Sequence, residues 1–162
     1  MAAILELIAD EAETTRDFDS IGESARRKLA PSICSSLAGS GNVIRAAALS
    51  MVLEARIAGA MANTERGPII GFEPPFAVEF AQKLQAFERT AAQRAVIVCS
   101  QSLRLALARF IEAVGVDIAV LGLAEVVPGY TVHVVETIGS SEALYQSRIR
   151  IRIERYFPCT LT

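Results

Sequence analysis

The 162-residue sequence predicts an α+β fold, in which a mainly helical subdomain with short strands precedes a small α/β subdomain. Two observations carry this prediction. Apolar residues recur at helical spacing through much of the first half, and the second half holds a buried strand, a helix and another buried strand in succession. We expect the helical subdomain at residues 1–90, the α/β subdomain at 91–139 and a tail at 140–162.

Two amphipathic helices are predicted at the start of the chain. From Ala3 to Ala12 the apolar residues recur at helical spacing, and acidic residues fill the other face. Asp19 or Ser20 can cap a second helix, whose apolar stripe runs from Ile21 to Leu37. Pro31 falls inside this second helix and removes a backbone hydrogen bond there, so we expect a kink or an early end.

The middle of the chain alternates between short strands and helices. Glycine and proline mark the ends of these segments, and Ser50 is a candidate N-cap. In chain order we expect a loop at 39–42, a strand at 43–49, a helix from 51 to about 61, a turn at 63–68, a short strand at 69–72 and a helix at 74–87.

The clearest local pattern is a strand–helix–strand unit. Ala95–Cys99 is an apolar run of the kind found in buried strands. Ser100 can cap the helix that follows, Gly115 ends that helix, and Ile118–Leu121 is a second buried strand. Such a unit implies parallel strands with a right-handed crossover. Residues 130–138 alternate well enough for a further strand.

The tail differs in character from the rest of the chain. Arginine and isoleucine alternate from Arg148 to Ile153, which is the pattern of an edge strand with one basic face. A loose tail is an equally good interpretation, and both stay open at this point.

Composition argues against several classes of partner. The chain carries 16 Lys and Arg against 18 Asp and Glu, whereas nucleic-acid binding needs a basic excess, so we expect no nucleic-acid partner. The basic residues at 26–28, and Arg104 with Arg109, fit a solvated helix face or ion pairs with the acidic first helix. Mean hydropathy is +0.37, but the longest uncharged stretch, Leu29–Ile44, is broken by proline, serine and glycine and cannot span a membrane.

The residues that usually carry chemistry are sparse. His133 is the only histidine, and its alternating strand context favours a structural role. Three cysteines without a C-x-x-C pair give no zinc motif, and the simplest interpretation is reduced, buried thiols in a cytosolic protein. The loop at 39–42 lacks the lysine and the strand–loop–helix context of a phosphate loop. We therefore predict no catalytic residue, cofactor or metal, and keep as an alternative a small enzyme with a site near Cys99 or Glu125.

Four segments, in order, resemble one family. They resemble the C-terminal cytoplasmic portion of the flagellar and type III secretion export-gate proteins, the FHIPEP family. The matching segments are ILELIADEAETTRD at 4–17, the pattern of Glu23, Arg26, Leu29, Ile33 and Cys34, the run from Leu53-Glu54 through Thr64–Gly67 to Pro74, and AVIVCSQSLRLALARFIEAVGVDIAVLGLAEVVPGYTVHVVETIG at 95–139.

The resemblance implies a role without catalysis. Members carry a membrane half and a cytoplasmic half, and the cytoplasmic halves form a ring beneath the export channel. That ring docks export substrates, chaperones and the ATPase stalk protein at the cytoplasmic face of the bacterial inner membrane. This chain would be a cytoplasmic fragment whose membrane half is missing, with ring contacts in its helical subdomain. A nonfunctional remnant of a truncated gene is a further alternative.

Opposite charges near the start of the chain suggest where a ring contact could lie. Packing between identical subunits favours complementary charged faces. The first predicted helix is acidic, and the second carries a basic cluster at 26–28. We expect Glu23, Arg26 and Arg27 at or near the ring contact. An ion pair within the chain, or a solvated pair, explains the same residues equally well.

Overall fold

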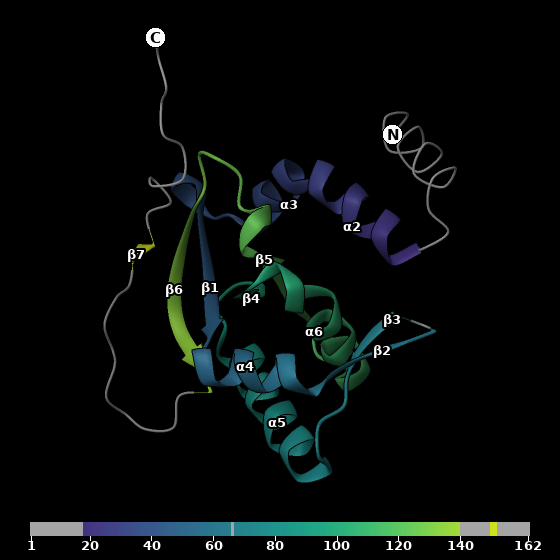
Figure 1. Cartoon of the computed structure of the whole chain (residues 1–162). Coiled ribbons are helices and arrows are strands. Elements are labelled where there is room, and N and C mark those ends of the chain that lie inside the picture. The colour runs from purple at the N-terminus through teal and green to yellow at the C-terminus, as the bar shows by residue number, and fades with distance from the viewer. Residues whose placement is uncertain (1–17, 66, 140–149, 152–162) are drawn as a thin grey trace.

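The computed structural model describes residues 18–65 and 67–139 and the backbone of Arg150–Ile151 (Figure 1). The predicted helix at 3–12 and most of the tail lie outside the described residues. The α-helices are α2 (Phe18–Lys28), α3 (Ala30–Leu37), α4 (Met51–Ala60), α5 (Pro74–Thr90) and α6 (Gln101–Val114), with 3₁₀ turns at Ser40–Asn42 (η1) and Leu123–Glu125 (η2). The strands are β1 (Val43–Leu49), β2 (Met61–Thr64), β3 (Gly67–Ile70), β4 (Ala95–Cys99), β5 (Ile118–Gly122), β6 (Thr131–Ile138) and β7 (Arg150–Ile151).

A five-stranded sheet with the order β5-β4-β1-β6-β7 organises the described part of the chain. The pairs β5–β4, β4–β1 and β1–β6 are parallel, and only β7 runs antiparallel to its neighbour β6. The mixed α and β content confirms the predicted fold class. The predicted strand–helix–strand unit is also confirmed, because β4 and β5 are parallel neighbours joined by α6.

The sheet is buried on both faces. Along β4, Ala95, Ile97 and Cys99 belong to one hydrophobic cluster, whereas Val96 and Val98 belong to another. This alternation follows from the two-residue period of a strand. Helices α4, α5 and α6 pack into the first cluster, and Cys34 of α3 packs into the second. Helices α2 and α3 accordingly lie on the opposite side of the picture from α4 and α5 (Figure 1).

Strand β1 lies at the centre of the sheet although it comes early in the chain. It pairs with β4 on one side and with β6 on the other. A division of the chain at residue 90 would therefore separate β1 from both of its partners. The sheet begins at Val43, and the limits of 1–90 and 91–139 stay a prediction.

The predicted interruption of the second helix is confirmed. Helix α2 ends at Lys28 and α3 begins at Ala30, with Leu29 between them. Pro31 occupies the first turn of α3, where its missing N–H has no intrahelical partner to lose. The proline therefore starts a new helix segment instead of damaging a continuous one.

The prediction for residues 61–70 was incomplete. The predicted turn at 63–68 is the tip of an antiparallel hairpin, in which β2 pairs with β3. Strand β2 was missed because its sequence, MANT, has no apolar alternation. Gly67 has a φ of 91°, a conformation that glycine adopts without strain, and it starts the return strand.

The tail contributes one short strand to the sheet. Backbone pairs join Ile151 to Val132 and Arg150 to His133, which places β7 at the edge next to β6. The edge-strand interpretation of the Arg–Ile repeat holds for these two residues. Among the helices of the described ranges, none is long and apolar enough to cross a membrane.

Candidate functional site: a charged seam along helix α2

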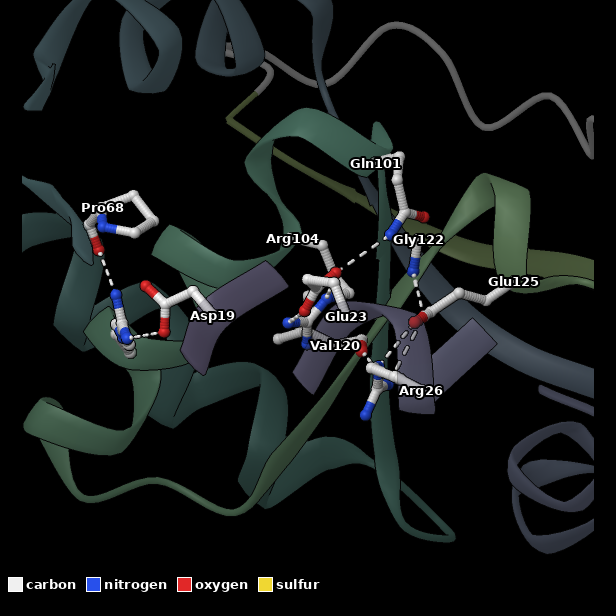
Figure 2. A network of polar contacts seen from close by, with 10 residues as sticks. Asp19, Glu23, Arg26, Pro68, Gln101, Arg104, Val120, Gly122 and Glu125 are labelled. Atoms are coloured by element: carbon white, nitrogen blue, oxygen red, sulfur yellow. Dashed lines mark hydrogen bonds and ion pairs between the residues drawn. The ribbon is translucent and has the colours of Figure 1, made fainter. Parts of the chain in front are cut away.

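Three charged residues lie on one face of α2. Asp19, Glu23 and Arg26 are spaced four and three residues apart, which brings their side chains onto the same side of a helix. Figure 2 shows these side chains in a row, each directed at a different partner on α6 or at the end of β5. We call these three residues and their partners Arg109, Arg104 and Glu125 the α2 seam.

Arg26 pairs with Glu125, the most buried side chain of the seam. Nε of Arg26 donates to Oε1 of Glu125 at 2.6 Å, and the Glu125 side chain is fully buried. The backbone N–H of Gly122 donates to the other carboxylate oxygen at 2.9 Å. A buried carboxylate is tolerated only when it is paired and hydrogen-bonded, and both conditions are met here (Figure 2).

Arg26 also covers the outer edge of the sheet. Strand β5 is an edge strand, and Nη2 of Arg26 donates to the backbone carbonyl of Val120 at 2.9 Å. An unpaired edge offers backbone groups to other chains, and a charged side chain placed on it blocks that pairing. Arg26 therefore joins α2 to the sheet and also protects the edge.

Glu23 is held by two residues at the start of α6. Nη2 of Arg104 contacts Oε1 of Glu23, and Nε of Arg104 donates to Oε2 at 3.1 Å. Nε2 of Gln101 donates to the same Oε2 at 3.3 Å. Arg104 is buried, so this two-pronged pair neutralises a cation that water does not reach.

Asp19 and Arg109 link α2 to the hairpin. Nη2 of Arg109 donates to Oδ1 of Asp19 at 2.5 Å, and its Nη1 donates to the carbonyl of Pro68 at 3.2 Å. A side chain at Gly67 would collide with both seam residues, so the hairpin approaches the seam closely because glycine occupies this position. The same contact holds the tip of the hairpin against α6.

An open cleft of about 880 Å³ lies beside the seam, between α2, the hairpin and α6. Phe18, with 87% of its surface exposed, and Arg27 line it from α2, whereas Glu65 and Leu105 line it from the hairpin and α6. The two seam carboxylates in the cleft, Asp19 and Glu23, are each paired with an arginine. Their charges therefore serve internal contacts and do not converge on a reaction centre.

The structure places the three predicted interface residues in different roles. Glu23 and Arg26 make ion pairs within the chain, which is the second interpretation that the sequence allowed. Arg27 is exposed and lines the cleft. Their place at a contact between subunits stays a prediction.

The structure gives the two arginines of α6 more specific partners than the sequence suggested. Arg104 and Arg109 pair with α2, whereas the sequence suggested a solvated face or the acidic first helix. The available signal was the complementary order of charges, negative at 19 and 23 and positive at 104 and 109.

The residues of the enzyme alternative are packed away from any cleft. Cys99 is 2% exposed, and burial raises the pKa of its thiol to about 12, with the nearby Glu54 charge adding to the effect. The Glu125 carboxylate accepts hydrogen bonds from Arg26 and from the backbone N–H of Gly122. Among the described residues, no group of histidine, cysteine and carboxylate side chains could hold a metal ion. A protonated buried thiol and a fully paired carboxylate are structural groups.

The thiols should be unreactive in the folded protein. In a chain with Cys159 replaced by serine, Cys34 and Cys99 should not react with a disulfide reagent at pH 8, because both are buried and the Cys99 thiolate forms only near pH 12. Both should react once guanidinium unfolds the chain. A fast-reacting thiol in the folded protein that Cys99→Ser abolishes would contradict this result and restore the enzyme alternative.

Comparison with known proteins identifies the class. The model of the FHIPEP family matches residues 1–131. The flagellar biosynthesis protein FlhA of Bacillus subtilis strain 168 is 27% identical over 128 residues, which cover 77% of this chain and 19% of that protein. The Shigella flexneri MxiA structure matches with a TM-score of 0.70 and 29% identity, over 83% of this chain and 45% of that one. Nonameric SctV-C from EPEC shares the fold, with a TM-score of 0.71 and 18% identity, over 85% of this chain and 42% of that one.

These matches are to C-terminal parts of type III export-gate components. The chain belongs to the FHIPEP family. It spans about a fifth of the curated relative and less than half of the solved chains. The family consists of components of the protein export apparatus and is not a family of enzymes.

Proposed function

We propose that this chain forms the C-terminal cytoplasmic part of a type III export gate, assembles into a ring and docks proteins on their way to export. The family match over residues 1–131 carries the proposal. The nonameric assembly of a relative with the same fold supports the ring. The partners we propose are export substrates, their chaperones and the ATPase stalk protein, at the cytoplasmic face of the bacterial inner membrane.

Within this proposal, α2 contributes to the contact between subunits. Glu23 and Arg26 fix the helix against α6 and the sheet edge. That arrangement leaves Arg27 exposed beside the cleft, which the exposed ring of Phe18 also lines. Exposed arginine and aromatic side chains on one surface are a combination that is enriched at protein interfaces. Arg27 is therefore the member of the predicted trio that would touch a neighbouring subunit.

Sedimentation velocity of the 162-residue chain tests the ring. We expect the mean mass to rise with protein concentration, and Arg27→Glu to reduce that rise at least several-fold, because it reverses a charge at the contact. Arg89→Glu is the matched control, since Arg89 is exposed on α5 and lies outside the seam and the cleft. The control should associate like the unchanged chain.

Partner docking is tested by pull-down with a type III chaperone–substrate complex and with an export ATPase stalk protein from the same bacterium. Retention of either, with none on an unrelated domain of equal charge, is the expected result. A folded chain that stays monomeric at every concentration and retains neither partner would overturn the proposed function and favour the truncated remnant. An unchanged association of Arg27→Glu would overturn only the placement of the contact.

A further inference from the structure

The charges along the seam follow an order that the proposed function does not require. On α2 the charges run negative, negative, positive through Asp19, Glu23 and Arg26. The facing charges run positive, positive, negative through Arg109, Arg104 and Glu125. Asp19 meets Arg109 and Glu23 meets Arg104, so α2 runs antiparallel to α6, and the three pairs form successive rungs (Figure 2).

A shift of α2 by one helical turn in either direction brings like charges together. In one direction Arg26 reaches the position of Glu23 and faces the buried Arg104. In the other direction Glu23 reaches the position of Arg26 and faces the buried Glu125. Each shift leaves a like-charge pair in a partly buried position, where one member of the pair is a buried side chain, and this is unfavourable.

Packing alone specifies this register weakly. On α2 the only buried residue besides Ile21 is Ser24, which is small. The larger Ile33 and Leu37, which pack against the second cluster, belong to α3. Ile21 is the only large apolar side chain of α2 that is buried. Small side chains can exchange places along a helix with little change in packing, whereas a displaced charge cannot.

We propose that the α2 seam is a register key. The mixed order of its charges selects one axial position of α2 on α6 and the β5 edge. The pairs Glu23–Arg104 and Arg26–Glu125 select the register. One shift places Arg26 against Arg104, and the other places Glu23 against Glu125. The pair Asp19–Arg109 attracts α2 to α6 but does not distinguish one register from another.

Neutralising both charges of one ion pair at a time tests which pairs select the register and which only attract α2 to α6. Arg26→Gln with Glu125→Gln removes the like charges from both shifted registers, and the amide introduced at position 125 still offers an acceptor to the N–H of Gly122. Asp19→Asn with Arg109→Gln is the matched control, because it also removes one ion pair but leaves Arg26 against Arg104 and Glu23 against Glu125 in the shifted registers.

The axial position is read as a distance between two spin labels by double electron–electron resonance. The labels are placed at Gly22→Cys, where a side chain meets no neighbour within 4 Å, and at Glu112→Cys, which is exposed on α6. Cys159 is replaced by serine, and Cys34 and Cys99 are too buried to label. A shift by one turn displaces α2 by about 5 Å along its axis.

We expect one distance in the otherwise unchanged chain and in the control. The Arg26→Gln/Glu125→Gln chain should show a second distance as well, because α2 in the shifted register lies about 5 Å further along its axis. If that variant does not fold, Glu23→Gln with Arg104→Gln makes the same prediction through the second rung. A single distance in a folded variant of this kind, or two distances in the control or the unchanged chain, would overturn the register key. The labelled chain is mixed with an excess of unlabelled chain, so that only distances within one chain are measured and the result is independent of ring assembly.

Discussion

Replacing Glu125 with alanine should lower the free energy of unfolding by about 3–5 kcal/mol. The change leaves Arg26, whose side chain is only 29% exposed, without its counter-ion. It also leaves the N–H of Gly122 without its carboxylate acceptor in a buried position. Urea unfolding of the 162-residue chain, followed by circular dichroism, measures the loss.

Two further variants separate the charge from the hydrogen bond. Glu125→Gln keeps an acceptor for Gly122 and should lose less stability than Glu125→Ala. Replacing both partners by apolar residues, Arg26→Leu with Glu125→Met, should recover the part of the loss that comes from the uncompensated charge, whereas the N–H of Gly122 stays without its acceptor. A loss below about 1 kcal/mol for Glu125→Ala would mean that the pair contributes little and that α2 is held by other contacts.

Replacing Phe80 with alanine should lower the free energy of unfolding by about 3–5 kcal/mol. Phe80 is 1% exposed and belongs to the cluster that joins α4, α5 and α6 to the sheet. Its ring lies 5.4 Å from that of Phe110 and 5.7 Å from that of Phe72, centre to centre. Truncation removes the buried surface and the aromatic contacts with Phe72, Phe76 and Phe110, and leaves a cavity that this close-packed region cannot fill.

Phe18→Ala is the matched control for this substitution. Phe18 is the same residue type but is 87% exposed at the start of α2, so the same truncation should change stability by less than about 0.5 kcal/mol. Urea unfolding of both variants under the same conditions gives the comparison. Equal losses for the two phenylalanines would contradict the placement of Phe80 in the core.

Segments whose structure is determined by residues close together in the sequence were predictable. The apolar run of β4 and the stop at Gly115 produced the strand–helix–strand unit, because five consecutive buried residues have few alternatives to a central parallel strand. Pro31 likewise produced the break between α2 and α3. In each case the deciding residues lie close together in the sequence.

Features that depend on distant residues were not predictable. Strand β1 contains three alanines, which are poor strand formers, and its central place comes from partners far along the chain. The seam joins Arg26 to Glu125, and nothing local to either residue announces the other. From the sequence alone, an ion pair within the chain is therefore only one of several interpretations for Arg26.

The central place of β1 also constrains the time course of synthesis. Strand β1 is complete at Leu49, but both of its edges stay open until β4 and β6 have been made, and β6 ends only at Ile138. Parallel pairing between distant segments forms slowly, because the long loop must close before any contact is gained. The ribosome must therefore release nearly the whole described chain before the sheet can close. Until then, at least one edge of the apolar strand β1 stays exposed, and folding chaperones have their longest opportunity to bind there.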